Sequence, residues 1–322
     1  MKAALFEKYG RPEEVVHISE VDMPTPTEGQ VLLEVRAASL NISDCYGITG
    51  FARFFGGGIT GPKDHRVSGD VAGRVRSVGN GVVRFKVGDE VFGTSAGAVA
   101  EYAVAREARL ALKPANVSFE EAAAAPVAGL TALQCLRDKG AVKAGQEVLI
   151  NGASGGVGTF AVQIAKALGA RVTGVCSTRN VEQARSIGAD QVIDYAKEDF
   201  TKTGQTYDLI ADVAAHHSVS AYKRTLKPQG RCLVVGLAGN PLIGMVKYSV
   251  LGKLGSITGS RKVSFMGIAR INREDLEVMA NLMAERKVRP VIERSYKLDE
   301  AGQALQYVLG KHSRAKNVIV MS

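Results

Sequence analysis

Val148-Leu-Ile-Asn-Gly-Ala-Ser-Gly-Gly-Val-Gly158 is an apolar segment that runs into a glycine-rich turn, and it decides the fold of this chain. The run 148–150 predicts a strand covered on both faces. The turn matches the dinucleotide-binding fingerprint, with Ala153 in the first glycine place. We therefore expect a dinucleotide phosphate site on five consecutive residues: Ser154, Gly155, Gly156, Val157 and Gly158.

The glycines of this turn have separate roles. Gly155 and Gly156 leave the backbone N–H groups open to a pyrophosphate that any Cβ would obstruct, and Gly158 allows the next helix to pack closely on the sheet. A helix that begins at Val157 or Thr159 would direct its free N–H groups and positive dipole end at the phosphates.

The chain from about residue 122 alternates between apolar strands and amphipathic helices. This alternation predicts βαβ units and a parallel sheet. The expected strands are 148–150, 171–175, 191–194, 209–212 and 231–235, and the expected helices are 159–168, 181–187 and 219–226.

The two ends of the chain show a different pattern. The first 120 residues predict short strands and turns, with strands at 31–35 and 71–78 and a turn at 88–93 that leads into another strand. The tail from about residue 262 predicts a helix at 274–286, a strand at 288–296, a helix at 300–309 and a strand at 317–320.

The bulk properties of the chain favour a globular protein of two domains that binds an anionic cofactor. The length is 322 residues, and domains have roughly 100–200 residues each. The net charge is +9, but Lys and Arg are scattered, which favours a solvated surface and an anionic cofactor over a nucleic-acid partner. We expect no membrane segment, a cytoplasmic location, and four buried thiols at Cys45, Cys135, Cys176 and Cys232.

The strand end after the first βα unit predicts which dinucleotide binds. In an NAD site an acidic residue stands about 20 residues beyond the turn and holds the ribose 2′-hydroxyl. Here that position is Thr178, flanked by Ser177 and Arg179, and no carboxylate is present. Hydroxyls and a planar guanidinium suit a 2′-phosphate, so we expect NADPH.

The chain resembles the medium-chain dehydrogenase/reductase superfamily, and within it the zinc-free quinone oxidoreductases related to zeta-crystallin. The motifs that carry this resemblance extend over the whole chain. They are Ala38-Ser-Leu-Asn41-x-x-Asp44, Gly69-Asp-Val-Ala-Gly73, Gly88-Asp-x-Val91, Pro126-Val-Ala-Gly-Leu-Thr-Ala132, Asn151-Gly-Ala-Ser-Gly-Gly-Val-Gly158 and Gly188-Ala-Asp-x-Val-Ile-Asp-Tyr195.

This resemblance implies an α/β fold in which a Rossmann doubly wound parallel sheet is inserted into a GroES-like, β-rich catalytic domain. The expected domains are 1–121 and 262–322 for the catalytic part and 122–261 for the NADP-binding part. The resemblance also implies further cofactor contacts: Tyr195 beside the 2′-phosphate, Asn41 and Thr131 near the nicotinamide half, Gly236 behind the nicotinamide ribose, and Phe265 covering it from a loop. We further expect a homodimer.

The residues do not support the catalytic zinc of other superfamily members. The resemblance places Asn41 where those relatives have a ligating Cys, and Gly69 where they have a His. A catalytic zinc needs three protein ligands, and two of those expected are missing. We therefore expect no metal.

Without a Lewis acid, hydride addition to a quinone or to the β-carbon of an enone is easier to support than alcohol chemistry, because the charge spreads onto a conjugated oxygen that hydrogen bonds can hold. Tyr46, five residues after Asn41, fits the spacing of a pocket tyrosine in the family pattern. Asn41 and Tyr46 are thus the candidate catalytic donors of an NADPH-dependent quinone or enone oxidoreductase. An NADP-dependent alcohol dehydrogenase or carbonyl reductase, and a non-catalytic NADPH-binding protein, stay open as alternatives.

The loop between Gly93 and Tyr102 departs from the family pattern. It is shorter here than in close relatives, and in the family it borders the substrate cleft. The size of the substrate therefore stays open.

Overall fold

The computed structural model describes residues 1–51, 53, 58, 60–67, 69–237, 244, 246–250, 260–310 and 313–321. The chain forms two compact units, one built from Met1–Leu130 together with Ile271–Ser322 and the other from Thr131–Arg270. The first unit thus uses both ends of the chain, and the second is an insertion between them.

The second unit is built from alternating strands and helices. Its described elements in chain order are η3 (Gln134–Lys139, a π-helix), β8 (Glu147–Asn151), α5 (Gly156–Ala167), β9 (Arg171–Cys176), η4 (Thr178–Asn180), α6 (Val181–Ser186), β10 (Gln191–Asp194), β11 (Tyr207–Asp212), α7 (Val219–Arg224), β12 (Leu226–Val234) and β13 (Lys262–Phe265).

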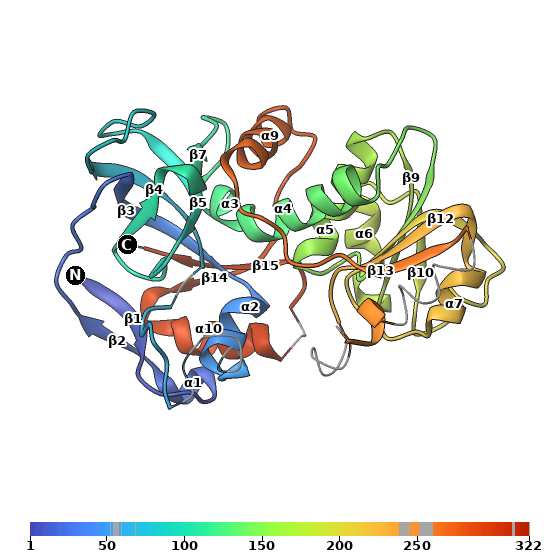
Figure 1. The fold of residues 1–322 in the computed structure, drawn as a ribbon, viewed down its shortest axis with the longest axis horizontal. Coiled ribbons are helices and arrows are strands. Elements are labelled where there is room, and N and C mark those ends of the chain that lie inside the picture. Colours follow the sequence, from blue (N-terminus) through green and yellow to red (C-terminus); the bar gives the residue numbers. More distant parts are fainter. Residues whose placement is uncertain are drawn as a thin grey trace. The chain divides into compact units, whose positions relative to one another are not determined.

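These strands form one six-stranded sheet in the order β10-β9-β8-β11-β12-β13, and every neighbouring pair is parallel. Counted along the chain this is the order 3-2-1-4-5-6, the doubly wound arrangement of dinucleotide-binding folds. Figure 1 shows the sheet with helices α5, α6 and α7 beside it. The predicted parallel sheet is confirmed.

Burial explains why these strands are continuously apolar. Val148, Leu149 and Ile150 in the central strand are fully buried, because helices cover a parallel sheet on both faces. Tyr207 and Tyr222 add large buried side chains to the same core.

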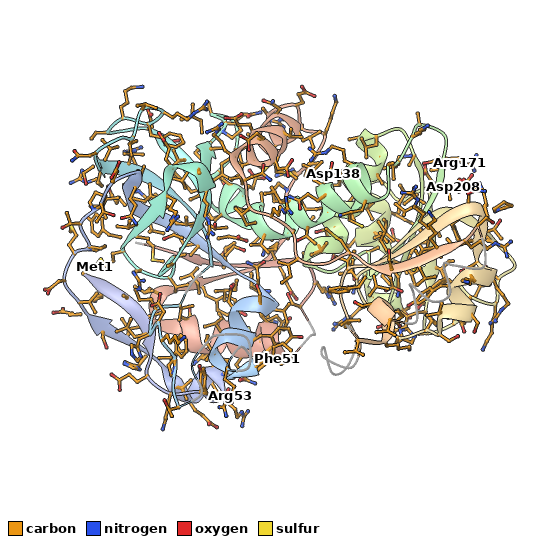
Figure 2. All side chains as sticks on the ribbon, viewed as in Figure 1. Met1, Phe51, Arg53, Asp138, Arg171 and Asp208 are labelled. Atoms are coloured by element: carbon orange, nitrogen blue, oxygen red, sulfur yellow. The ribbon has the colours of Figure 1, made fainter. Side chains whose placement is uncertain are left out.

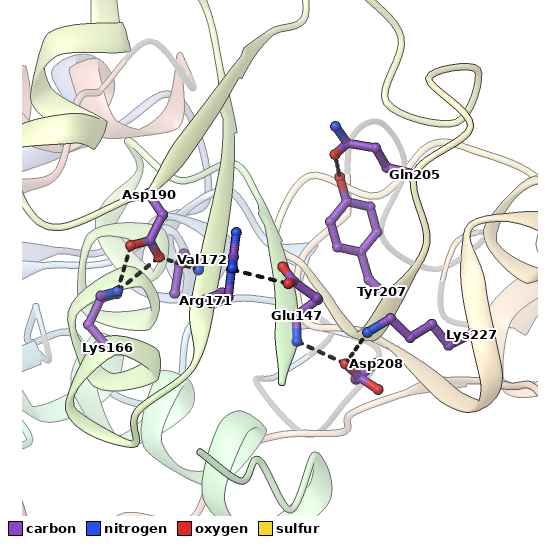
Figure 3. A network of polar contacts seen from close by, with 9 residues as sticks. All are labelled: Glu147, Lys166, Arg171, Val172, Asp190, Gln205, Tyr207, Asp208 and Lys227. Carbon is purple, nitrogen blue, oxygen red and sulfur yellow. Dashed lines mark hydrogen bonds and ion pairs between the residues drawn. The ribbon is translucent and has the colours of Figure 1, made fainter. Parts of the chain in front are cut away.

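Ion pairs gather at the amino-terminal ends of the central strands (Figure 3). Glu147 at the start of β8 pairs with Arg171 at the start of β9, with 3.2 Å between Oε1 and Nε. The backbone N–H of Glu147 donates to Asp208 over 2.8 Å, and Lys227 pairs with the same carboxylate. The opposite edge, at the carboxyl ends, is the one where ligands bind in sheets of this class.

The first unit is rich in β-structure. Its described elements are β1 (Lys2–Phe6), α1 (Pro12–Val15), β2 (Val16–Glu20), β3 (Gln30–Leu40), α2 (Ile42–Ile48), β4 (Gly69–Val78), β5 (Glu90–Ser95), β6 (Tyr102–Arg106), η2 (Glu107–Arg109), β7 (Leu110–Leu112), α3 (Phe119–Ala124), α4 (Pro126–Leu133, which crosses the boundary), α9 (Arg273–Ala284), β14 (Ile292–Lys297), η5 (Leu298–Glu300), α10 (Ala301–Leu309) and β15 (Lys316–Val320).

Its main sheet has seven strands, in the order β14-β15-β3-β4-β5-β7 with β6 also paired to β3. Strand β15, from the end of the chain, pairs antiparallel with β3, from its beginning. One core accordingly contains Leu33 and Val71 from the first part of the chain and Leu305 and Ile319 from the last part.

The structure corrects several expected boundaries. The expected helix 219–226 ends at Arg224, because Leu226 already belongs to β12 and pairs with Tyr207. The strand expected at 31–35 extends over Gln30–Leu40, and the one expected at 288–296 begins only at Ile292. The helix α2 after Asn41 was not predicted.

Along the chain, the boundaries between the two units lie at 130/131 and 270/271. The sequence placed the domain boundaries at 121/122 and 261/262. Two interactions keep residues 262–270 in the second unit. Strand β13 pairs with β12, and the side-chain amide of Gln134 both accepts from the backbone N–H of Arg270 and donates to its carbonyl.

The four cysteines are buried thiols, as the sequence predicted. Burial raises the pKa of Cys45 and of Cys135 to about 12, which keeps both neutral. No helix in the described part of the chain has the length and the apolar character needed to cross a bilayer.

Candidate functional site

The glycine-rich turn lies at the carboxyl end of β8, where the strand order of the parallel sheet reverses. Gly152 has a φ of +83°, a left-handed conformation that suits glycine. Gly155 is the N-cap of α5, and the helix begins at Gly156 rather than at Val157 or Thr159 as expected. The first turn of α5 therefore begins within the fingerprint, and its free N–H groups lie where a phosphate would bind.

Two of the fingerprint glycines are needed for different reasons. A Cβ on Gly158 would lie 1.9 Å from the carbonyl oxygen of Gly152, so the fold itself requires glycine there. A Cβ on Gly155 would meet only that same oxygen, at 3.5 Å, an ordinary contact. The fold therefore does not require glycine at position 155, and the open space beside it fits a pyrophosphate cradle.

Asn180 connects the glycine turn to the predicted 2′-phosphate residues, and the sequence analysis missed it. Its side-chain nitrogen donates to Ser154 Oγ over 2.9 Å and to Ser177 Oγ over 3.2 Å. Asn180 is buried, and its Oδ1 has no partner among the described residues. Ser154 and Ser177 are thereby held together although the chain separates them by a helix and a strand.

A carboxylate from the neighbouring strand lies beside the predicted 2′-phosphate residues, although the end of β9 itself has none, as the sequence indicated. Asp194 ends β10 and pairs in register with Cys176 at the end of β9. Thr178 Oγ1 donates to its Oδ2 over 2.7 Å, and this hydrogen bond holds the pKa of Asp194 below its usual range. Thr178 and Arg179 are exposed, and Tyr195 is 63 % exposed.

The residues expected on the nicotinamide side also follow carboxyl strand ends of the second unit. Gly236 comes after β12, and a Cβ there would lie 2.2 Å from the carbonyl oxygen of Val213, so the backbone alone demands glycine. Phe265 is the last residue of β13 and packs against the core, not in a loop as expected. Thr131 lies in α4 and is half-buried.

A second feature that the sequence did not predict joins the ends of the two central strands. Asn151 at the end of β8 donates from Nδ2 to Asp212 Oδ1 at the end of β11 over 2.8 Å. Tyr222 donates to the other oxygen of Asp212 over 2.6 Å. Burial raises the pKa of Asp212 and of Tyr222, so the phenol stays protonated as a donor.

In the first unit, Asn41 is the N-cap of α2 and belongs to a buried polar cluster. Its backbone N–H donates to Asp44 Oδ2 over 2.7 Å. Its side-chain Nδ2 donates to Asp70 Oδ2 over 3.0 Å, and its Oδ1 accepts from Lys316 Nζ over 2.5 Å. Asn41, Asp70 and Lys316 are buried and Asp44 is half-buried. We name these four residues the buried polar cluster.

Burial sets the protonation of the two carboxyl groups in this cluster. Desolvation and the neighbouring charge of Asp70 raise the pKa of Asp44 to about 7. Desolvation also raises the pKa of Asp70, against the ammonium of Lys316, which acts in the opposite direction. Asp70 accepts a further hydrogen bond from the backbone N–H of Val127 in the first turn of α4, over 3.0 Å.

Tyr46, the other candidate donor, lies on α2 and is half-buried. Its ring contacts Phe51, labelled in Figure 2, with 5.1 Å between the centroids. Burial raises the pKa of Tyr46, and its hydroxyl makes no hydrogen bond to a described residue. The phenol is therefore protonated and has no hydrogen-bond partner among the described residues.

The residues at the expected zinc positions do not fit a zinc ion. The amide of Asn41 is already bonded to Asp70 and to the Lys316 ammonium, a cation that would repel a metal. At Gly69 a Cβ would lie 3.0 Å from the backbone oxygen of Ser39, and Ser68 of the same motif lies outside the described residues. Among the described residues no three His, Cys, Asp or Glu side chains gather as metal ligands. The absence of zinc stays a prediction.

A cavity of about 480 Å³ lies elsewhere in the first unit, between α9 and the segment around β7. Its lining includes Arg84, Phe85, Leu112 and Arg273, and none of the predicted site residues lines this cavity.

Comparison with known proteins gives consistent matches along the chain. Residues 27–115 match the family described as alcohol dehydrogenase GroES-like domain, and residues 187–319 match the one described as zinc-binding dehydrogenase. The chloroplast envelope quinone oxidoreductase homolog of Arabidopsis thaliana is 34 % identical, over 99 % of this chain and 98 % of that protein. The quinone oxidoreductase of Sus scrofa is also 34 % identical, over 98 % of this chain and 95 % of that protein.

Solved structures agree with these relatives. The quinone oxidoreductase from Coxiella burnetii superposes with a TM-score of 0.86 at 29 % identity, over 100 % of this chain and 99 % of that one. The Escherichia coli quinone oxidoreductase complexed with NADPH superposes with a TM-score of 0.80 at 25 % identity, over 99 % and 100 %.

Substitution by alanine should have different effects at Gly155 and at Gly158. Gly155→Ala should keep the unfolding free energy and weaken NADPH binding roughly ten- to a hundredfold, because the methyl group blocks hydrogen bonds to a charged phosphate. Gly158→Ala should lower the unfolding free energy by about 1–3 kcal/mol through overpacking. Chemical denaturation and fluorescence titration measure the two effects. If Gly155→Ala binds NADPH as tightly as the wild type does, the pyrophosphate does not bind at this turn.

The raised pKa of Asp44 predicts how stability depends on pH. The folded state holds a proton on Asp44 up to about pH 7, whereas the unfolded state releases it near 3.8. The contribution to stability is therefore complete below about pH 4 and is lost as the pH rises to about 7, with a slope of about 1.4 kcal/mol per pH unit in between. Asp44→Asn should remove this slope in denaturation curves measured from pH 5 to 7.5.

Asp64→Asn is the matched control, because Asp64 lies in the same unit and its hydrogen bond from Arg66 holds its pKa below the usual range. It should leave the slope between pH 5 and 7.5 unchanged. Equal slopes in the wild type and in Asp44→Asn would show that Asp44 does not carry this dependence.

Proposed function

This chain belongs to the zinc-free quinone oxidoreductase family of the medium-chain dehydrogenase/reductase superfamily, and on that basis we propose that it is an NADPH-dependent reductase of quinones or α,β-unsaturated carbonyls. It has the GroES-like and Rossmann parts of that family, and it is an oxidoreductase of a family that binds NAD(P)H. What we propose beyond this is that the chain prefers NADPH to NADH, and that a quinone or an α,β-unsaturated carbonyl accepts the hydride.

The second unit supplies the binding of the dinucleotide. The first turn of α5 offers free N–H groups to the pyrophosphate, and Gly155 leaves the space. Ser177, Thr178, Arg179 and Tyr195 follow the ends of β9 and β10, where a 2′-phosphate would bind. The negative charge of Asp194 is offset by the Thr178 hydroxyl and by Lys197, 3.7 Å away.

The observation that carries the proposed chemistry is that α2 and its N-cap bring hydrogen-bond donors, Tyr46 and Asn41, where other superfamily members have a zinc ligand. The bound nicotinamide supplies a hydride. The chain's own part is then to hold the oxygen on which negative charge develops, and the Tyr46 hydroxyl, with its raised pKa, is a protonated donor for that oxygen. One N–H of the Asn41 amide is a second donor. Hydrogen bonds of this kind suit a conjugated enolate or hydroquinone oxygen better than a full alkoxide.

Further expectations belong to the same proposal. The substrate is a small molecule, the protein is a homodimer in the cytoplasm, and neither nucleic acid nor a membrane is a partner. The NADP-dependent alcohol dehydrogenase or carbonyl reductase stays the second candidate, because the structure of an NAD-dependent alcohol dehydrogenase superposes with a TM-score of 0.84 at 27 % identity. The third alternative, a non-catalytic NADPH-binding protein, predicts that NADPH is not oxidised in the presence of quinones, enones or aldehydes.

Arg179 should carry the preference for NADPH over NADH. A hydrogen bond to a charged group contributes about 1.5–3 kcal/mol, so Arg179→Ala should weaken NADPH binding roughly ten- to a hundredfold and leave NADH binding almost unchanged. Fluorescence titration with both cofactors measures this. Arg185→Ala, an exposed arginine on the next helix paired with Glu182, is the control and should change neither affinity. Equal weakening of both cofactors in Arg179→Ala contradicts the assignment.

The fate of the hydride tests the proposed reaction. NADPH deuterated at both C4 positions, reacted with an enone, should place the label on the β-carbon. Tyr46→Phe should lower kcat about 10²–10³-fold and leave NADPH affinity intact. Tyr307→Phe, which removes a hydroxyl bonded to Glu293 in the same unit, is the control. Label at the carbonyl carbon, giving an allylic alcohol, would establish carbonyl reduction instead.

A further inference from the structure

Lys316 is almost completely buried although it carries a charge. Its side chain is 2 % exposed, and it lies at the first residue of β15, next to the end of β3. Its Nζ donates to Leu40 O over 3.1 Å and to Asn41 Oδ1 over 2.5 Å, and it lies 3.5 Å from Asp70 Oδ2. An ammonium has three N–H donors and no acceptor, so these three oxygens use all of them.

The side chain of Asn41 can therefore adopt only one orientation. An ammonium can only donate, so the atom of Asn41 that faces Lys316 must be the oxygen. The nitrogen then faces Asp70, which accepts one of its two N–H groups over 3.0 Å. The flipped amide would place two donors together at Lys316 and two acceptors together at Asp70. The second N–H of Asn41 has no partner among the described residues.

We propose that Lys316 is a positioning residue, which locks the Asn41 amide so that it presents one N–H, and never its carbonyl, to a bound oxygen acceptor. This inference rests on the proposed function and extends it, since that function requires a donor near the reacting groups. The acceptor is an oxygen of the substrate or an oxygen of the nicotinamide half of the cofactor. A site locked in this way selects acceptors and rejects groups that donate.

The central experiment is a double-mutant cycle between Lys316 and Asn41. Lys316→Met keeps the length of the side chain and removes the ammonium. It should lower kcat about 10²–10³-fold, the effect of losing one oriented donor, or weaken NADPH binding roughly ten- to a hundredfold. In an Asn41→Ala background the same substitution should change either quantity less than about threefold, because its effect acts through Asn41. A purely structural lysine would cause the same loss in both backgrounds.

Lys113→Met is the matched control. Lys113 is also buried in the first unit, with a side chain 4 % exposed, and its ammonium donates to the backbone oxygens of Pro114 and Val117 and pairs with Glu90. It makes no contact with the buried polar cluster, so Lys113→Met should leave kcat and cofactor affinity within about threefold of the wild type.

Removing Lys316 alone leaves Asp70 as an unpaired buried charge, which is strongly destabilising. The double variant Asp70→Asn with Lys316→Met removes both charges together and keeps the test valid if the single variant does not fold. It removes both groups that orient the Asn41 amide, so its loss should equal or exceed that of Lys316→Met.

Two arms identify the source of the acceptor oxygen. Titration with NADPH and with 2′-phospho-ADP-ribose, which lacks the nicotinamide, compares the cofactor with and without that half. A loss of affinity for NADPH alone assigns the oxygen to the nicotinamide half, and a loss of kcat with both affinities unchanged assigns it to the substrate. Either result supports the positioning role.

A spectroscopic readout separates this inference from the proposed function. In ¹⁵N-labelled protein, the side-chain amide signals of Asn41 are identified by their absence in Asn41→Ala, and they should shift in Lys316→Met but not in Lys113→Met. If the wild type reduces neither quinones nor enones, the proposed function fails, and these signals together with the two titrations still test Lys316. Unchanged Asn41 signals in Lys316→Met, or equal losses in both backgrounds of the cycle, would overturn the inference.

Discussion

The buried carboxylate of Asp70 is the constraint on which much of the first unit depends. A carboxylate removed from water must be paired and hydrogen-bonded, or the folded state loses several kcal/mol. Asp70 meets this requirement with three partners from distant parts of the chain: the Asn41 amide, the Val127 backbone N–H and the Lys316 ammonium. These contacts join β4 to the starts of α2 and α4 and to the final strand β15.

The same pairing connects stability to the proposed chemistry. Asp70 and Lys316 together determine the orientation of the Asn41 side chain. The backbone N–H of Asn41 bonds Asp44, whose neutral form is favoured by burial. Asn41, at the expected place of a zinc ligand, is therefore bonded to the ammonium of Lys316. The donors available on α2 are neutral groups, Asn41 and Tyr46, and such groups suit the delocalised charge of a conjugated oxygen.

In the second unit, strand direction brings the predicted cofactor residues together. All six strands are parallel, so the segments after β8, β9, β10, β12 and β13 emerge at one edge of the sheet. This explains how the glycine turn, Ser177, Tyr195 and Gly236 lie on the same edge. Asn180 then joins two of these segments by bonding Ser154 and Ser177 directly.

Residue order alone was enough to predict the parallel sheet, the helix after the glycine turn, the buried thiols and the family. Hydrophobic periodicity, and the room that a glycine leaves beside the backbone, depend on residues that are close in the sequence. They can therefore be inferred from residue order. Only the tertiary structure revealed that Asp194 lies beside Thr178, that Asn180 joins two loops, and that Lys316 bonds Asn41 across 275 positions of the chain. Strand register between distant segments decides such contacts, because a shift of one residue moves a side chain to the opposite face of the sheet.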